Sequence, residues 1–249
     1  MKQLIYISIL FFIFGCSTLH NKHTPKKHTT KFVFTDNSPN IDDSNYKNNF
    51  TINYLSKMYY GFDGSTLFYG EFNLIGKKKI YFKPIDSIKI ENNSQTYWGH
   101  FLEETKIYNI KENHFSLKDK KGKKLNFQIY PYHSSTIIEK HWRIEYVSKD
   151  KSPNLDKEIY FILKNETKNF SGYNGCNNFF GSYEIDEENN KISFTNIGQT
   201  KKACINIKIS EKDINNIFVN ANSFVNIDDY LILLDINHKI LAVFAAIYF

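Results

Sequence analysis

The sequence lacks the motifs by which common enzyme classes are recognised. It contains no Gly-x-Ser-x-Gly nucleophile turn, no His-Glu-x-x-His zinc motif and no glycine-rich phosphate loop before a helix. The adjacent acids Glu103-Glu104 and Asp186–Glu188 stand among polar, turn-forming residues, so we expect them in exposed loops. No nucleophile with a base, carboxylate pair or open metal site is indicated. We therefore expect a protein without catalytic residues, cofactor or metal.

Cysteine, glycine and proline are also scarce. The chain has 3 Cys, 11 Gly and 5 Pro in 249 residues, and no Cys-x-x-Cys pair that would activate a thiol for redox chemistry. Core-forming residues are plentiful, because 22 Phe and 17 Tyr are present. This composition excludes disorder over most of the chain and suits two modest domains.

The chain has no apolar run near its start that is long enough to span a bilayer. Leu4–Phe14 is apolar apart from two residues, follows the positive Met1-Lys2 and has the length of a secretory signal. Ile13–Cys16 resembles the lipobox of bacterial lipoproteins, which implies a signal peptide at residues 1–15 and a lipidated Cys16 anchored in a membrane. Ser17 in place of Asp favours the outer membrane under the enterobacterial sorting rule. The alternative is an ordinary signal peptide with an incidental cysteine.

Lipidation of Cys16 after cleavage leaves two cysteines with thiols that can pair with each other. In an oxidising envelope compartment, Cys176 and Cys204 are expected to form a disulfide. Closing this loop would contribute about 3–4 kcal/mol in the chain-entropy model. Two buried free thiols are the alternative, and a redox-active pair is a further one.

Residues 16–49 are predicted to form a flexible tether, because they contain few apolar residues and much Lys, His, Thr, Asn and Asp. His20, His23 and His28 fall within it, but no Cys or carboxylate stands close enough to complete a metal site. A solvated tether, with its lysines near anionic lipid, is the favoured interpretation.

Residues 50–135 are predicted to form a β domain of unassigned type. Short runs rich in β-branched and aromatic residues alternate with turn signals such as Asp63-Gly64 and Lys121-Gly122, which is typical of a small sandwich or open barrel. Expected strands include Thr66–Phe72 and Thr96–Phe101. Up to residue 140 there are 20 Lys and Arg against 12 Asp and Glu. This excess suits an anionic partner such as lipid or polysaccharide, or simply lysines on solvent faces; nucleic acid is not expected as a partner.

Residues 140–249 are predicted to form a second β domain with one helix. Strands are expected at Glu158–Lys164 and Thr200–Ile205, among others, and Ser210 can cap a helix with Asp213 three residues later. A hairpin follows around Asn237-His238. Its last strand is apolar almost throughout, so we expect it to be central in its sheet or covered on both faces.

A family becomes recognisable in this second half. Phe170–Tyr183, read together with Thr200–Cys204 and the helix and strands that follow, resembles the META domain, the family of the heat-inducible lipoprotein HslJ. The residues that carry the resemblance are Ser171, Gly172, Gly175, Cys176, Asn177, Phe179, Gly181, Thr200, Ala203 and Cys204. It implies a compact antiparallel β fold with one packed helix in an envelope or stress-response setting, without established catalytic residues. The first domain has a weaker analogy to copper-stress lipoproteins such as NlpE.

Together these observations predict a mainly β protein with two small antiparallel domains, the C-terminal one carrying a single packed helix. The leading functional hypothesis is a non-catalytic, lipid-anchored envelope protein related to stress tolerance, facing the periplasm, with a protein partner for the second domain. A barrel that carries or senses a small ligand or lipid, and a protease inhibitor, are the alternatives. The oligomeric state is left open.

Overall fold

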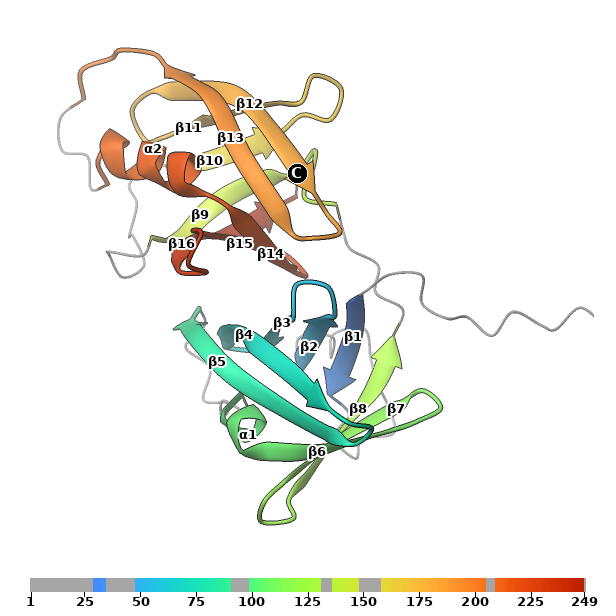
Figure 1. Cartoon of the computed structure of the whole chain (residues 1–249). Helices are drawn as coiled ribbons and strands as arrows, with labels where there is room; N and C mark the ends of the chain where they lie inside the picture. The colour runs from blue at the N-terminus through green and yellow to red at the C-terminus, as the bar shows by residue number, and fades with distance from the viewer. Residues whose placement is uncertain are drawn as a thin grey trace, which may run out of the picture.

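The computed structural model describes residues 29–34, 48–90, 99–130, 136–147, 158–204 and 209–248, which form two closed antiparallel barrels in succession (Figure 1). The predicted fold class is confirmed: the described chain is mainly β, and the packed helix belongs to the second barrel. The predicted signal peptide and Cys16 lie outside the described residues.

The first barrel has eight strands and one short helix. In chain order these are β1 (Thr29–Phe34), β2 (Asn48–Asn53), β3 (Met58–Asp63), β4 (Thr66–Ile75), β5 (Lys79–Lys89), α1 (Gly99–Glu104), β6 (Thr105–Lys111), β7 (His114–Asp119) and β8 (Lys124–Tyr130). Each strand pairs with the next, and β1 closes the barrel against β8.

Two predictions for this half are wrong. The tether predicted for residues 16–49 contains β1 and the start of β2, because Thr29–Phe34 pairs with β2 on one side and with β8 on the other. Of the strand predicted for Thr96–Phe101, residues 96–98 lie outside the described residues, and residues 99–101 belong to α1, whose Leu102 is fully buried against the barrel.

Aromatic rings fill the interior of the first barrel. The Phe50 ring lies 4.8 Å from that of Phe32 and 5.0 Å from that of Phe127, and Phe82 and Phe115 lie within 6.2 Å of it. Offset and edge-to-face contacts at these distances add to the burial of apolar area. The described interior is thus packed with side chains.

The second barrel also has eight strands. These are β9 (His141–Val147), β10 (Tyr160–Leu163), β11 (Asn169–Tyr173), β12 (Asn178–Asp186), β13 (Lys191–Gln199), β14 (Ser223–Ile227), β15 (Tyr230–Leu234) and β16 (Ile240–Ile247), with α2 (Glu211–Asn220) between β13 and β14. The first strand, β9, closes the barrel by pairing with both β10 and β16.

Helix α2 closes the aromatic core of this barrel. Ser210 caps it as predicted: its Oγ accepts a hydrogen bond from the Asp213 N–H at 3.1 Å. Ile214, Ile217 and Phe218 are buried on one face of the helix. The Phe218 ring lies 5.0–5.3 Å from four core phenylalanines of the barrel, namely Phe161, Phe170, Phe179 and Phe194.

The two barrels share an apolar interface. Strand β3 is buried along its whole length, because Tyr59 faces the interior of the first barrel while Met58, Tyr60 and Phe62 face the second. The second barrel contributes buried residues of β14, β15 and β16, namely Val225, Ile227, Ile232, Leu234, Ile240 and Val243. Over residues 240–244 the last strand is therefore covered on both faces, as its sequence predicts, whereas residues 245–247 are half-buried.

Polar contacts flank this interface. Asp228 accepts hydrogen bonds from Lys31 and, at 2.7 Å, from the Asn49 amide. The buried Tyr69 hydroxyl donates to the His238 carbonyl at 2.8 Å, and burial raises the pKa of Tyr69 well above its usual range. An apolar contact flanked by hydrogen bonds from one barrel to the other is the property of an interface that fixes two domains together.

Candidate functional site

The turn between β11 and β12 contains the centre of the predicted motif. Gly175 has φ of +92°, a conformation that favours glycine. The Asn174 side-chain oxygen accepts hydrogen bonds from the backbone N–H groups of Cys176 at 3.0 Å and Asn177 at 2.7 Å. This Asx-type arrangement replaces strand pairing with local hydrogen bonds.

The predicted disulfide is present. Cys176 and Cys204 are bonded, with their Cα atoms 5.9 Å apart and their positions separated by 28 in sequence, and Cys176 is buried. The bond ties the segment after β13 to the β11–β12 turn. Residues 200–204 form no strand, so that part of the predicted strand Thr200–Ile205 is wrong, and the remainder lies outside the described residues.

The side chain of Asn177 connects the same two segments. Its oxygen accepts hydrogen bonds from the Thr200 hydroxyl and the Lys202 N–H, both at 2.7 Å. Its amide nitrogen donates to the Lys202 carbonyl at 3.2 Å and to Glu211 Oε1 at 2.7 Å. Asn177 is 1% exposed, so an amide with two donors and one acceptor satisfies a site that water does not reach.

Glu211 extends this network to the helix. It is the first residue of α2, where its carboxylate is favoured by the helix dipole, and its Oε2 accepts a hydrogen bond from the Gln199 amide at 2.9 Å. Gln199 in turn accepts one from the Asn174 amide at 3.3 Å. The turn, the disulfide segment and α2 are thereby held as one polar unit.

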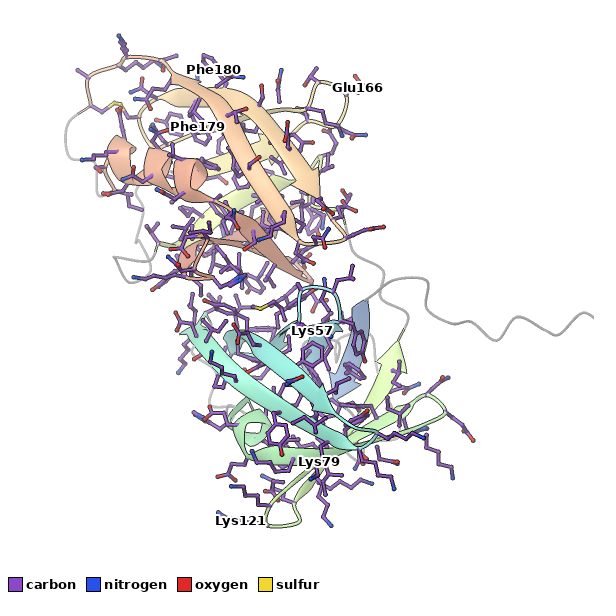
Figure 2. All side chains as sticks on the ribbon, viewed as in Figure 1. Lys57, Lys79, Lys121, Glu166, Phe179 and Phe180 are labelled. Atoms are coloured by element: carbon purple, nitrogen blue, oxygen red, sulfur yellow. A yellow bond between two sulfur atoms is a disulfide. The ribbon has the colours of Figure 1, made fainter. Side chains whose placement is uncertain are left out.

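Two motif glycines are required by close packing. A Cβ on Gly172 would lie 2.1 Å from the Tyr160 carbonyl oxygen, and one on Gly181 would lie 2.5 Å from the Phe170 ring. Phe179 points into the barrel while its neighbour Phe180 is 53% exposed on the outside (Figure 2). Of the remaining motif residues, Ser171 and Ala203 are exposed.

The structure therefore gathers most of the predicted motif into one place, but with structural roles. The cysteines are bonded to each other, and the amides are occupied by hydrogen bonds within the unit. In the part of the chain that the structure describes, no group of three or more His, Cys, Asp or Glu residues is placed to hold a metal ion. Neither described helix is long and apolar enough to cross a membrane.

A cavity between the two barrels is a feature that the sequence did not predict. Its volume is about 190 Å³, and its walls include Met58 of the first barrel and Val225 and Leu234 of the second. Ser56 and Ser223 also line it, and their hydroxyls are buried without a hydrogen-bond partner among the described residues. A sequence signal for a shared wall existed, since β3 is apolar or aromatic at adjacent positions rather than at alternate ones.

Comparison with known proteins assigns the second barrel. Residues 135–247 match the family model described as the META domain. No curated protein matches the chain. One solved structure that is similar to this chain is described as the NMR structure of the protein from Burkholderia xenovorans. Its sequence is 18% identical, and the match covers 48% of this chain and 100% of that chain. The TM-score of 0.37 is too low to support a conclusion. The family match contains the disulfide, the Asn177 network, α2 and every strand of the second barrel. This chain therefore carries a META domain over residues 135–247.

Proposed function

We propose that the protein is a non-catalytic, lipid-anchored protein of the cell envelope, in which the META domain acts as an interaction module for a protein partner during envelope stress. The anchor is Cys16, and the proposed location is the outer membrane, facing the periplasm. The single observation that carries the non-catalytic role is the structural use of the motif. Its cysteines and buried amides hold a turn, a loop and a helix together, which leaves the domain to act through its surface.

The compartment is supported by the cysteines. A disulfide buried at one end and joined to a hydrogen-bond network suits an oxidising compartment outside the cytoplasm. The basic start, the apolar run and Ile13–Cys16 supply the route to it. A fully modified lipoprotein cysteine carries several acyl chains, and each buried CH₂ contributes about 0.8 kcal/mol, so release from the membrane would be slow.

Membrane fractionation of cells tests the anchor. Wild-type protein should sediment with membranes as the cleaved chain, and Cys16→Ala should either leave the membranes or accumulate as the uncleaved precursor. Ser17→Ala is the matched control, because it changes the adjacent residue and leaves the thiol in place. A Cys16→Ala protein that is cleaved and still sediments like the wild type would count against the proposal.

A second candidate function is the binding of a small amphiphilic molecule between the barrels. The 190 Å³ cavity favours it, since it offers apolar walls and two buried hydroxyls without partners. A dry cavity of about 150 Å³ suffices for a benzene-sized ligand. The packed rings around Phe50 make the interior of the first barrel a poorer place for such a ligand.

Native mass spectrometry after mild extraction tests this alternative. A bound molecule should add a discrete mass to the wild-type protein and be depleted in Ser223→Val, which replaces a hydroxyl of the cavity by two methyl groups. Benzyl alcohol serves as a probe: it should raise the melting temperature of the wild type more than that of the variant. An equal response in both proteins would refute binding at this place.

A further inference from the structure

A row of exposed side chains runs across five strands of the first barrel. Ile75 pairs with Lys79, Lys79 with Ile107, Ile107 with Lys118, and Lys118 with Lys124. Directly paired residues point to the same face of a sheet, so these side chains form one continuous outward row. All of them are exposed, and the two isoleucines keep 51% and 46% of their surface open. We call this set the isoleucine–lysine row.

The turns at both ends of the row add positive charge. Lys77 and Lys78 are exposed in the β4–β5 turn, and Lys120, Lys121 and Lys123 are exposed in the β7–β8 turn. Figure 2 shows Lys79 and Lys121 at the end of the first barrel that lies away from the second. The basic surface is therefore free of the interface between the barrels.

Acidic side chains of the described residues do not neutralise the charge of the row. Within residues 48–130 that the structure describes, no ion pair is formed by Lys79, Lys118 or Lys124. The nearby Asp119 is 7% exposed and accepts the backbone N–H of Lys123 at 2.8 Å, so it serves the turn. Glu71 contacts Lys83 at 3.3 Å, outside the row.

We propose that the isoleucine–lysine row and its two flanking turns dock the first barrel onto an anionic lipid bilayer. This inference rests on the proposed lipid anchor, which would hold the barrel beside a bilayer. Charge complementarity selects the partner: each lysine near an anionic leaflet is attracted to it, while its aliphatic stem can lie along the apolar boundary. Ile107 stands between Lys79 and Lys118, and Ile75 lies beside Lys79 at the end of the row, so both isoleucines would enter the interfacial region.

The length of chain before the barrel permits this orientation. Cys16 and the first residue of β1, Thr29, are 13 positions apart in sequence. Thirteen extended residues reach at most about 45 Å. An anchored Cys16 therefore leaves the barrel enough length to turn the row toward the same membrane.

Vesicle flotation tests the docking. Residues 16–249 carrying Cys16→Ala are mixed with vesicles of phosphatidylcholine alone or of phosphatidylcholine with phosphatidylglycerol. We expect binding to the anionic vesicles, about 100-fold weaker when Lys79, Lys118 and Lys124 are all changed to Glu. Ile75→Ser with Ile107→Ser should weaken binding to the same vesicles at least about tenfold without changing net charge.

A matched control changes three exposed lysines of the second barrel, Lys201, Lys212 and Lys239, to Glu. It alters net charge equally and should retain most of the binding. Equal loss in both triple variants, or binding of the first triple variant at the wild-type level, would overturn the proposal. So would wild-type binding to a soluble anionic polysaccharide with none to anionic vesicles. Unchanged thermal unfolding confirms that each variant is folded.

The vesicle assay and the fractionation assay fail independently. Because the vesicle protein carries Cys16→Ala, an absence of lipidation in cells would leave flotation intact. Conversely, loss of flotation with normal release of Cys16→Ala from cell membranes would remove the docking surface and keep the anchor.

Discussion

Replacing Asn177 by aspartate tests whether the Asn177 side chain connects the β11–β12 turn to residues 200–202 and to α2. The change is nearly isosteric, but it converts the amide that donates to Glu211 at 2.7 Å into a second carboxyl group. The donation to the Lys202 carbonyl is lost as well. Each lost hydrogen bond costs about 1 kcal/mol.

The electrostatic cost is larger. Two carboxylates whose oxygens are 2.7 Å apart repel by about 6 kcal/mol at an effective dielectric constant of 20. Protonation of one of the two carboxylates costs less than this repulsion, because keeping a proton at pH 7 on a carboxyl with an ordinary pKa near 4 costs about 4 kcal/mol. The shared proton restores one hydrogen bond. We therefore expect Asn177→Asp to lose about 5 kcal/mol at pH 7 and about 1–2 kcal/mol at pH 4.

The direction in which the free energy of unfolding of Asn177→Asp changes with pH follows from proton linkage. Between about pH 4 and pH 7 the folded variant binds a proton that the unfolded chain releases, so its free energy of unfolding falls as pH rises. Urea unfolding at several pH values measures it. In a Trp98→Phe background the fluorescence reports the second barrel alone, because Trp142 is fully buried there and the chain has 2 Trp.

Two controls separate charge from lost contacts. Asn177→Ala removes the hydrogen bonds without adding a charge, so its loss should not vary over this pH range. Adding Glu211→Gln to Asn177→Asp restores a donor–acceptor pair and should recover most of the stability at pH 7. If Asn177→Asp is as stable as the wild type at pH 7, or is destabilised as much at pH 4 as at pH 7, the role assigned to Asn177 is wrong.

Three further predictions concern other parts of the structure. Gly172→Ala should lower the free energy of unfolding in urea by about 3 kcal/mol or more, because its Cβ would lie 2.1 Å from a backbone carbonyl oxygen of β10. Gly76→Ala is the control: its Cβ would have open space, and it should lower the free energy of unfolding by about 1 kcal/mol. Tyr69→Phe leaves a carbonyl of the second barrel unpaired and should destabilise the junction by about 1–2 kcal/mol, seen as faster amide exchange in β3 and β15; an unchanged exchange rate would contradict the contact. The hydrogen bond that the Tyr248 hydroxyl donates to Asp229 raises the pKa of Tyr248 to about 12, so the stabilisation from this bond is complete below pH 10 and lost as pH rises through 12. In spectrophotometric titration, Tyr248→Phe should remove a phenolate step at high pH. Loss of a step at lower pH instead would refute the assignment.

Local chemistry in the sequence predicted much of the second barrel. Ser210 and Asp213 specify a helix start through side-chain hydrogen bonds three residues apart, and that start is where the structure has it. The disulfide was predictable once a compartment was assumed, because two cysteines leave one pairing. The role of Asn177 was not, since its partners at positions 200, 202 and 211 come together only in the folded chain.

The first barrel and the junction were harder to predict. The strand β1 is six residues long in a polar stretch, and it depends on hydrogen bonds to β2 and β8 rather than on its own propensity. The cavity at Ser223 and the row at Ile75 depend on long-range pairing between strands. Strand spacing predicts that strands exist, but the register that brings an isoleucine beside a lysine requires the fold.

The membrane anchor can be examined by mass spectrometry of the mature N-terminus, on protein extracted from membranes. We predict a first residue Cys16 whose sulfur carries a diacylglyceryl group, with residues 1–15 absent. A mature chain that begins elsewhere, or that carries Cys16 as an unmodified thiol, would contradict it.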